Sequence, residues 1–359
     1  MGVRLLGKAM GNAQTGVAGS APAALDRYRE MVQRELRETF PPSDLALYRM
    51  LRYHLGWVDQ DDRPTAQGGG KGLRPTLCIL ACEMAGGKAT AALPCAAALE
   101  LVHSFSLIHD DVQDGDTERH HRPTVWVVWG QAQAIGAGNA MRALADRAVL
   151  RLAERGVDLS TALEASAALT TRCLEMIEGQ YLDLALEETT EVTVEGYLDL
   201  VGRKTGALID AAMHLGALVA TADGSLATSL GRCGRLLGMA FQVQDDILGI
   251  WGDAQATGKP TGADIRRRKK SFPAVHALQH ARGRDGKALH SIYGRQGPTE
   301  EDVEIVLGIM ERLGTRGQSQ DLAHTLYRQA MRCLDRLTLA SGPLREFQEV
   351  ASFLVTRQY

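Results

Sequence analysis

The spacing of the apolar residues constrains the fold more than any other feature of this chain. They recur every three or four positions, which is the period of an amphipathic helix. Alternating patterns typical of strands are nearly absent apart from residues 124–128, and aromatic residues make up only 5%. The helix-period segments are 22–55, broken at Pro41-Pro42, then 75–86, 92–114, 131–155, 160–188, 195–221, 225–250, 300–313 and 318–338. We therefore predict an all-α fold.

The breaks between these segments are too short to separate domains. Glycine-rich stretches at residues 67–72, 252–262 and 283–298 have the length of loops rather than of interdomain linkers. Near the N-terminus, basic residues alternate with apolar runs that glycines interrupt, which is typical of a flexible tail. We therefore expect a tail over residues 1–21 and one helical domain over residues 22–359.

The composition argues against several classes of protein. Hydrophobic residues make up 45% and charged residues 23%, which is enough apolar material for a large core. A net charge of −3 lacks the basic excess of nucleic-acid-binding proteins. We found no signal-peptide pattern and no uninterrupted apolar run of about 18 residues, so we expect no membrane span. The six cysteines lack any C-x-x-C pair, which favours core positions and a reducing cytoplasm.

An acidic cluster follows an apolar helical segment in the stretch HDDVQDGDTERHH, residues 109–121. On a helix, Asp110 and Asp114 lie on one face, and His103 falls on the same stripe. Carboxylates in this arrangement repel one another unless a cation lies between them. Taken alone, the cluster is also compatible with a solvated acidic helix end.

A second acidic pair, Asp245 and Asp246, ends another apolar stretch in FQVQDD, with Gln242 one turn earlier on the same face. Two such pairs indicate a cavity with an acidic mouth and an apolar interior. Oxygen ligands favour Mg²⁺, which usually bridges protein carboxylates to substrate phosphates. The pattern therefore predicts a site for a diphosphate carried on an apolar tail.

Basic residues stand in turns close to these acidic clusters. GGGKGLRP is a glycine-rich turn that opens a helix, where backbone N–H groups and cations bind phosphate, although most such turns are only turns. The run GKPTGADIRRRKKSFP is either a solvated basic face or a loop that closes over an anion, and its position after the second acidic pair favours the loop. The candidate anion-binding residues are Lys71, Arg74, Lys204, Thr205, Lys259, Lys269 and Lys270.

Taken in order, these motifs resemble the head-to-tail isoprenyl diphosphate synthases of the trans-polyprenyl synthetase family. The matching tracts are GGGKGLRP, ELVHSFSLIHDDVQD, GQYLDL, KTG, FQVQDD and the lysine-rich run that contains GKPTG, and they extend from about residue 68 to residue 273. The resemblance implies an antiparallel helix bundle around a deep hydrophobic cavity, usually as a homodimer. It also implies Mg²⁺-dependent transfer of an allylic diphosphate's prenyl group to isopentenyl diphosphate.

The resemblance also implies roles for individual residues. Its implied ligands for three Mg²⁺ ions are Asp110, Asp114 and Asp245, supported by Asp111, Asp246 and Gln242. Its implied allylic diphosphate site contains Arg119, Lys204 and Lys259, and Thr205 beside Lys204 is a further substrate-binding residue. Its implied isopentenyl diphosphate site contains Lys71, Arg74 and His103, and Lys269 aligns with a lysine of the closing loop.

The length of the product is predicted from the residues before the first motif. Phe105 lies five residues before Asp110, with Ser106 beside it. In similar enzymes an aromatic residue at that position blocks the growing chain, and DDVQD lacks the two-residue insertion found in some relatives. Both features are typical of short-chain synthases, so we expect geranylgeranyl diphosphate, and farnesyl diphosphate as the second choice. Ordinary core packing of Phe105 is the alternative.

Three positions depart from the family pattern. His120 replaces the second arginine of a pair, which the resemblance places in the isopentenyl diphosphate site, and a histidine cannot form a bidentate contact with phosphate. Asn139 and Gly249 stand where aspartates are usual. A weakened isopentenyl site would suit a terpene-cyclase-like enzyme or a prenyltransferase with another acceptor. A non-catalytic helical partner subunit is a third hypothesis. The retained cations of the isopentenyl site and the low aromatic content favour elongation.

Overall fold

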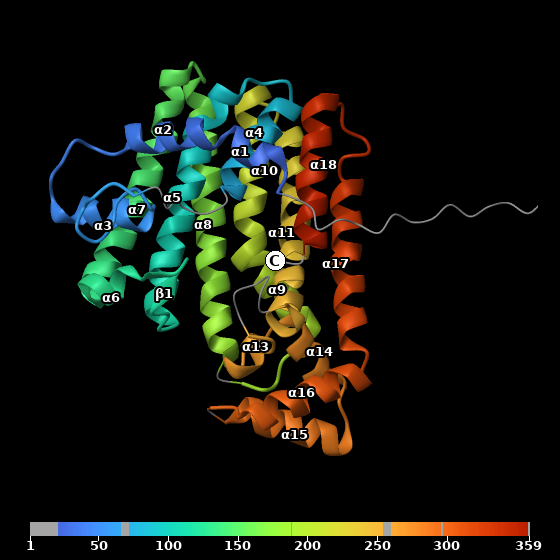
Figure 1. Ribbon diagram of the computed structural model, residues 1–359. Helices are drawn as coiled ribbons and strands as arrows, with labels where there is room; N and C mark the ends of the chain where they lie inside the picture. The colour runs from blue at the N-terminus through green and yellow to red at the C-terminus, as the bar shows by residue number, and fades with distance from the viewer. Residues whose placement is uncertain (1–20, 66–71, 188, 254–259, 296, 358–359) are drawn as a thin grey trace, which may run out of the picture.

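The computed structural model describes residues 21–65, 72–187, 189–253, 260–295 and 297–357. It confirms the predicted fold class, an all-α antiparallel helix bundle (Figure 1). The α-helices are α1 (Ala23–Arg27), α2 (Arg29–Thr39), α3 (Ala46–His54), α4 (Leu73–Met84), α5 (Ala89–Gln113), α6 (Val125–Trp129), α7 (Gln131–Leu150), α8 (Leu159–Glu187), α9 (Val194–Val201), α10 (Ala207–Thr221), α11 (Gly224–Trp251), α13 (Ala263–Arg266), α14 (Phe272–His280), α15 (Gly283–Gly294), α16 (Glu300–Arg312), α17 (Thr315–Arg332) and α18 (Ser341–Thr356). Two short strands, β1 (Glu118–Arg119) and β2 (Arg122–Pro123), form a hairpin.

The long helices α5, α8, α10, α11 and α17 run side by side along the bundle (Figure 1). Helix α10 packs against α4, α8 and α11, so it lies at the centre. Helices α15 and α16 lie across one end of the bundle, and α3, α6 and the hairpin lie at one side (Figure 1). The fold therefore brings the end of α5 close to α8 and to the turn before α10.

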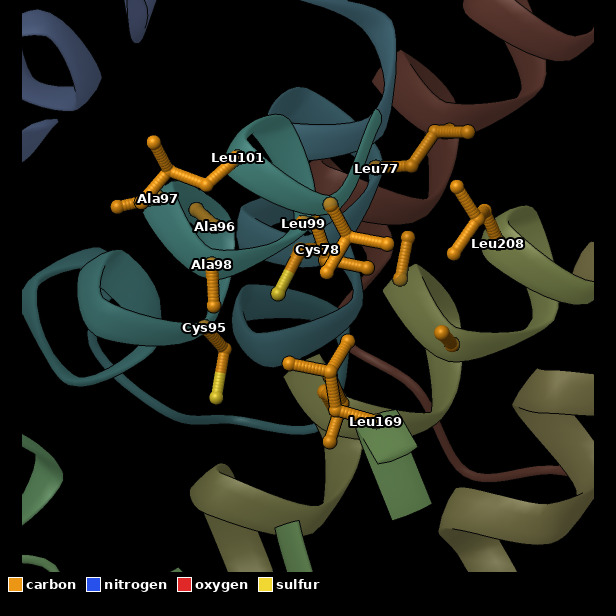
Figure 2. Close-up of a cluster of buried hydrophobic side chains, with 14 of the residues drawn as sticks. Leu77, Cys78, Cys95, Ala96, Ala97, Ala98, Leu99, Leu101, Leu169 and Leu208 are labelled. Carbon is orange, nitrogen blue, oxygen red and sulfur yellow. The ribbon is translucent and has the colours of Figure 1, made fainter. Parts of the chain in front are cut away.

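The central core is built from small and branched side chains. Residues 207–219 of α10 are buried throughout. Leu77 and Cys78 of α4 pack with Leu99 of α5, and Leu169 of α8 and Leu208 of α10 join them (Figure 2). Burying one such leucine contributes about 1.5–3 kcal/mol, so this cluster fixes the spacing of the four helices. Most cysteines belong to the same core, as predicted, and burial raises the pKa of Cys82 to about 12.

Several local predictions were wrong. The alternating residues 124–128 lie largely in helix α6, because strand propensity depends on having a neighbouring strand to pair with. The stretch 283–298, interpreted as a break, contains helix α15. The segment 195–221 is interrupted by a π-helical turn, Gly202–Gly206, between α9 and α10. Helices α14 and α18 were not predicted.

Helix α5 is the one helix among the described residues that is long and apolar enough to cross a membrane by composition. Its most apolar window has a mean hydropathy of 1.6. However, 67% of that window is buried inside the bundle, as in a core helix. Of the expected N-terminal tail, residues 1–20 lie outside the described residues.

Candidate active site

A cavity of about 570 Å³ opens between α5, α7, α8 and α10. Its apolar lining comes from Phe105, Leu107, Met176, Ile177, Leu184 and Leu208. Its polar lining includes Asp110, Gln113, Gln180, Lys204 and Thr205. Phe105 precedes Asp110 by five residues on α5, which is about 7.5 Å along the helix axis. The cavity therefore joins an apolar wall to a charged one, as the sequence predicted.

The carboxylates of Asp110 and Asp114 lie one turn apart at the end of α5. Burial raises the pKa of Asp110 to about 7; Lys204 opposes this shift, and the charge of Asp114 reinforces it. Burial also raises the pKa of Asp114. Within the described part of the chain, no side chain donates a hydrogen bond to either carboxylate. Such a pair favours a small, hard cation.

Lys204 reaches this acidic pair from the π-helical turn, a feature that often occurs at functional sites. Gly179 of α8 lies against the turn, and a Cβ atom there would be 2.3 Å from the backbone nitrogen of Lys204. Only glycine permits this approach. The ammonium group of Lys204 forms an ion pair with Asp183 of α8. Asp183 was missed as a site residue, although its carboxylate within the GQYLDL tract was an available signal.

Asp246 is the buried centre of the second acidic cluster, with 1% of its surface exposed. It accepts hydrogen bonds from the Tyr197 hydroxyl at 2.7 Å, the Gln242 amide at 3.1 Å and the backbone N–H of Phe272 at 2.9 Å. The ammonium group of Lys269 lies 3.0 Å from the same carboxylate. Burial disfavours the charge on Lys269, but neighbouring carboxylates, above all that of Asp246, raise its pKa. Asp246 therefore holds Lys269 in place.

The ion pair of Lys204 with Asp183 and the cluster around Asp246 face a common space. A small cavity of about 100 Å³ is lined by Asp183 and Lys204 on one side and by Asp246 and Lys269 on the other. The hydroxyl of Thr205 donates a hydrogen bond of 2.8 Å to Gln242, which links the π-helical turn to α11. The bundle thus brings the KTG and FQVQDD motifs together from two different helices.

Asp245 is engaged with the end of the chain. Its carboxylate forms an ion pair with Arg357, which follows α18, and the Gln244 amide donates to the Arg357 carbonyl oxygen at 2.9 Å. The Arg357 guanidinium also lies 4.5 Å from the centre of the Phe241 ring. The sequence did not point to Arg357. The metal-binding role of Asp245 stays a prediction.

Arg119, on the β1–β2 hairpin, holds Asp111 rather than facing the large cavity. Its Nε donates to the Asp111 carboxylate at 2.8 Å, and Asp111 is only 1% exposed. A second cavity, of about 110 Å³, is lined by Asp111, Arg119, His103 and His120. His103 lines both cavities and so lies between them. Arg119 and His120, expected in different diphosphate sites, therefore share one cavity.

The remaining predicted residues lie in different parts of the chain. Arg74, Ser106 and Asn139 line the large cavity. Lys71 and Lys259 lie outside the described residues. The departure at Gly249 has a structural reason, because a Cβ atom there would be 2.2 Å from a carboxylate oxygen of Asp264.

Metal binding by the protein alone has little support in the geometry. Among the residues that the structure describes, no three His, Cys, Asp or Glu side chains converge closely enough to hold an ion. Mg²⁺ commonly binds through one or two carboxylates, with water and substrate phosphates as the other ligands. The carboxylates of Asp110 and Asp114 fit that second mode, in which the ion binds together with a diphosphate.

Comparison with known proteins identifies close relatives. The polyprenyl synthetase family profile matches residues 57–310. A (2E,6E)-farnesyl diphosphate synthase of Mycobacterium tuberculosis is 37% identical over 92% of this chain and 91% of that protein. A geranylgeranyl diphosphate synthase of the same species is 41% identical over 82% of this chain and 85% of that protein. A crystal structure of a polyprenyl synthetase from Streptomyces coelicolor superposes with a TM-score of 0.86 at 38% identity, covering 93% of this chain and 99% of that one.

Proposed function

This chain belongs to the polyprenyl synthetase family and is a prenyltransferase, and from this premise we propose that it condenses an allylic diphosphate with isopentenyl diphosphate to form a short-chain prenyl diphosphate. The observation that carries the proposal is the joining of an apolar cavity to a charged wall formed by Asp110 and Lys204, where Asp183 holds the ammonium group of Lys204. An apolar tail fits the first part and its diphosphate the second. The comparisons lend no support to the cyclase-like alternative.

The charged residues would bind and orient the two diphosphates. Magnesium ions held by Asp110, Asp114 and Asp245 would supply positive charge that stabilises diphosphate as a leaving group. Lys204 and Lys269, held by Asp183 and Asp246, would add fixed cations from two sides of the small cavity. Because these side chains are already held by carboxylates, little reorganisation is needed when the substrate binds.

The apolar wall would protect the reaction from water. The C–O bond of the allylic diphosphate breaks, a C–C bond forms to the terminal carbon of isopentenyl diphosphate, and one proton is lost. Water would trap an allylic cation, so the apolar lining around Phe105 and Leu208 serves to exclude it. The released diphosphate can accept the proton, so this assignment requires no side-chain base.

The proposal is tested by incubating the purified protein with Mg²⁺ and dimethylallyl, geranyl or farnesyl diphosphate, with and without isopentenyl diphosphate. Products are dephosphorylated and identified by mass spectrometry. A prenyl alcohol longer by five carbons or a multiple of five, formed only when isopentenyl diphosphate is present, is expected. A hydrocarbon or cyclic alcohol formed without isopentenyl diphosphate would contradict the proposal.

Product length is proposed to depend on Phe105, whose ring packs edge-on against His109 with 4.9 Å between ring centres. We expect geranylgeranyl diphosphate from the wild type and products longer by one or more five-carbon units from Phe105→Ala, because truncation enlarges the cavity. The truncation also costs about 3–5 kcal/mol of stability. Phe347→Ala, in the fully buried part of α18, is the matched control and should lose stability without lengthening the product. Unchanged product length in a folded Phe105→Ala variant would contradict this role.

A homodimer is proposed from the outer surface of α7 and α8. Large apolar side chains are exposed there, including Ile135, Leu163, Leu174 and Tyr181, the last with 72% of its surface exposed. Tyr181 also lines the large cavity, so a second copy at this surface would cover one side of it. We expect twice the monomer mass by light scattering, and a monomer for Leu163→Glu/Leu174→Glu. A wild type that is monomeric at micromolar concentration would overturn the proposal.

A further inference from the structure

The π-helical turn that carries Lys204 and Thr205 is packed tightly between two helices. Such turns are rare in proteins, so the groups around this one have to hold its shape. On the side of α8 the turn rests against Gly179. On the side of α11 it rests against Gly238, where a Cβ atom would be 2.9 Å from the Cα atom of Gly206. Backbone contacts this close leave the turn little room to move.

Arg235 of α11 contacts the turn at both of its ends. Its Nη1 donates a hydrogen bond of 3.3 Å to the carbonyl oxygen of Gly202, the first residue of the turn. Its Cγ atom lies beside Gly206, the last residue, where a Cβ atom would be 3.2 Å away. The side chain of Arg235 therefore binds one end of the turn by a hydrogen bond and the other by van der Waals contact.

The same guanidinium group is fixed by two carboxylates from other helices. Its Nε donates at 3.1 Å to Asp210 in the first turn of α10, and its Nη2 forms an ion pair with Glu175 of α8. Asp210 has only 6% of its surface exposed, and its other oxygen accepts a hydrogen bond of 3.3 Å from Arg172 of α8. Three nitrogen atoms of one rigid fork thus connect α8, α10 and the π-helical turn to α11.

This cluster of arginines and carboxylates lies apart from the substrate cavities. Arg235, Asp210 and Glu175 line neither of the two cavities that contain Lys204. Their charges are paired with one another, so they have little to offer a diphosphate. Lys204, in contrast, lines both cavities. What Arg235 can change is therefore the position of the backbone from which Lys204 extends.

We propose that Arg235 is a positioning residue, which holds the π-helical turn so that the Lys204 ammonium group and the Thr205 hydroxyl face the diphosphate. The inference rests on the proposed function and deepens it, because it names what fixes one cation of the charged wall. Asp183 holds Lys204 at the tip of its side chain, whereas Arg235 holds the backbone at its base. A displacement of about 1 Å at such a site can lower a rate by about a hundredfold.

The test uses variants of the full chain. Arg235→Met removes the guanidinium fork and keeps an aliphatic stem, and Arg235→Lys keeps the charge without the fork. Arg151→Met is the matched control. Arg151 likewise donates to a backbone carbonyl oxygen, that of Glu35, and pairs with nearby carboxylates, but it lines neither cavity that contains Lys204.

The measurements are kcat and KM for the allylic substrate, and calorimetry of inorganic diphosphate binding in the presence of Mg²⁺. They are made at a temperature at which circular dichroism shows each variant to be folded. We expect Arg235→Met to lower kcat/KM by about tenfold to a hundredfold and to weaken diphosphate binding. Arg235→Lys should lie between Arg235→Met and the wild type. Arg151→Met should lose stability but keep wild-type kinetics and diphosphate affinity.

A double-mutant cycle decides whether Arg235 acts through Lys204. If it does, most of the loss caused by Arg235→Met should disappear in a chain that already carries Lys204→Ala. The effect of Arg151→Met should be the same in both backgrounds, because its site is independent. If Arg235→Met does not fold, Arg235→Lys takes its place in the cycle.

Two results would overturn the inference and leave the proposed function intact. One is an equal loss from Arg235→Met with and without Lys204→Ala, and the other is wild-type kinetics and diphosphate affinity in folded Arg235→Met. If Lys204→Ala changes neither activity nor diphosphate binding, the charged wall of the proposed function is wrong as well. A wild type that binds diphosphate but forms no prenyl product would contradict the proposed function alone, because the binding cycle still decides the role of Arg235.

Discussion

Replacing Asp110 by asparagine is expected to lower the rate of prenyl transfer by at least about a thousandfold. The substitution keeps the size of the side chain but removes one of the three carboxylate charges proposed to hold magnesium. A thousandfold corresponds to about 4 kcal/mol, which is within the several kcal/mol that a bound metal contributes to stabilising a leaving group. The measurement is single-turnover product formation at saturating Mg²⁺, together with calorimetry of Mg²⁺ and inorganic diphosphate binding.

Asp146→Asn is the matched control, because Asp146 is an exposed carboxylate on α7 paired with Arg142, away from the cavity. Its activity should stay within about twofold of the wild type, since exposed ion pairs contribute at most about 1 kcal/mol. Retention of activity by Asp110→Asn would contradict the metal-based mechanism as a whole. In that mechanism the diphosphate of every allylic substrate binds through magnesium held by this carboxylate.

The Asp110→Asn variant should also be more stable than the wild type when no metal is added. The pKa of Asp110 is raised to about 7 in the folded protein, so the folded state binds a proton that the unfolded state releases near pH 4. Stability contributed by this group is therefore lost as the pH rises from about 4 to 7. Asparagine cannot ionise, so the variant should escape this loss. Urea unfolding at pH 5 and pH 8 in EDTA measures the difference.

Replacing Asp246 by alanine is expected to destabilise the fold by about 2–5 kcal/mol. The change leaves two buried donors, the Tyr197 hydroxyl and the Phe272 N–H, without an acceptor, at about 1–3 kcal/mol each. It also removes the partner of Lys269, which adds less because 38% of that side chain is exposed. Activity should fall as well, since Lys269 and Gln242 lose the group that orients them. Urea unfolding and steady-state kinetics measure the two effects.

Two further variants separate these effects. Asp246→Asn keeps one acceptor oxygen, so its loss of stability should be smaller than that of alanine. Asp199→Ala removes an exposed carboxylate that pairs with Arg203 one turn later on the helix, and it should cost about 0.5 kcal/mol or less. An Asp246→Ala protein as stable as Asp199→Ala would show that the buried hydrogen bonds do not contribute as proposed.

Local spacing in the sequence was enough to predict the parts of the site that lie on one helix. Asp110 and Asp114 share a face because four residues make about one helical turn, and Phe105 lies on the same helix before them. The capping box of α16, in which Thr299 and Asp302 bond each other's backbone, likewise follows from residues three apart. Helix α15 was missed because glycine and polar residues weaken a local signal that tertiary packing overrides.

The sequence by itself determined the fold class, the family and the residues that end each acidic helix, because these depend on periodicity and on motifs of a few residues. Only the tertiary structure decided which distant groups meet. It paired Asp183 with Lys204, made Asp246 a buried anchor, joined Asp245 to Arg357 at the end of the chain, and brought His54 to the hairpin. The physical reason is that the helical period indicates which face of a helix is apolar. Which other helix contacts that face is determined by side-chain packing across the bundle.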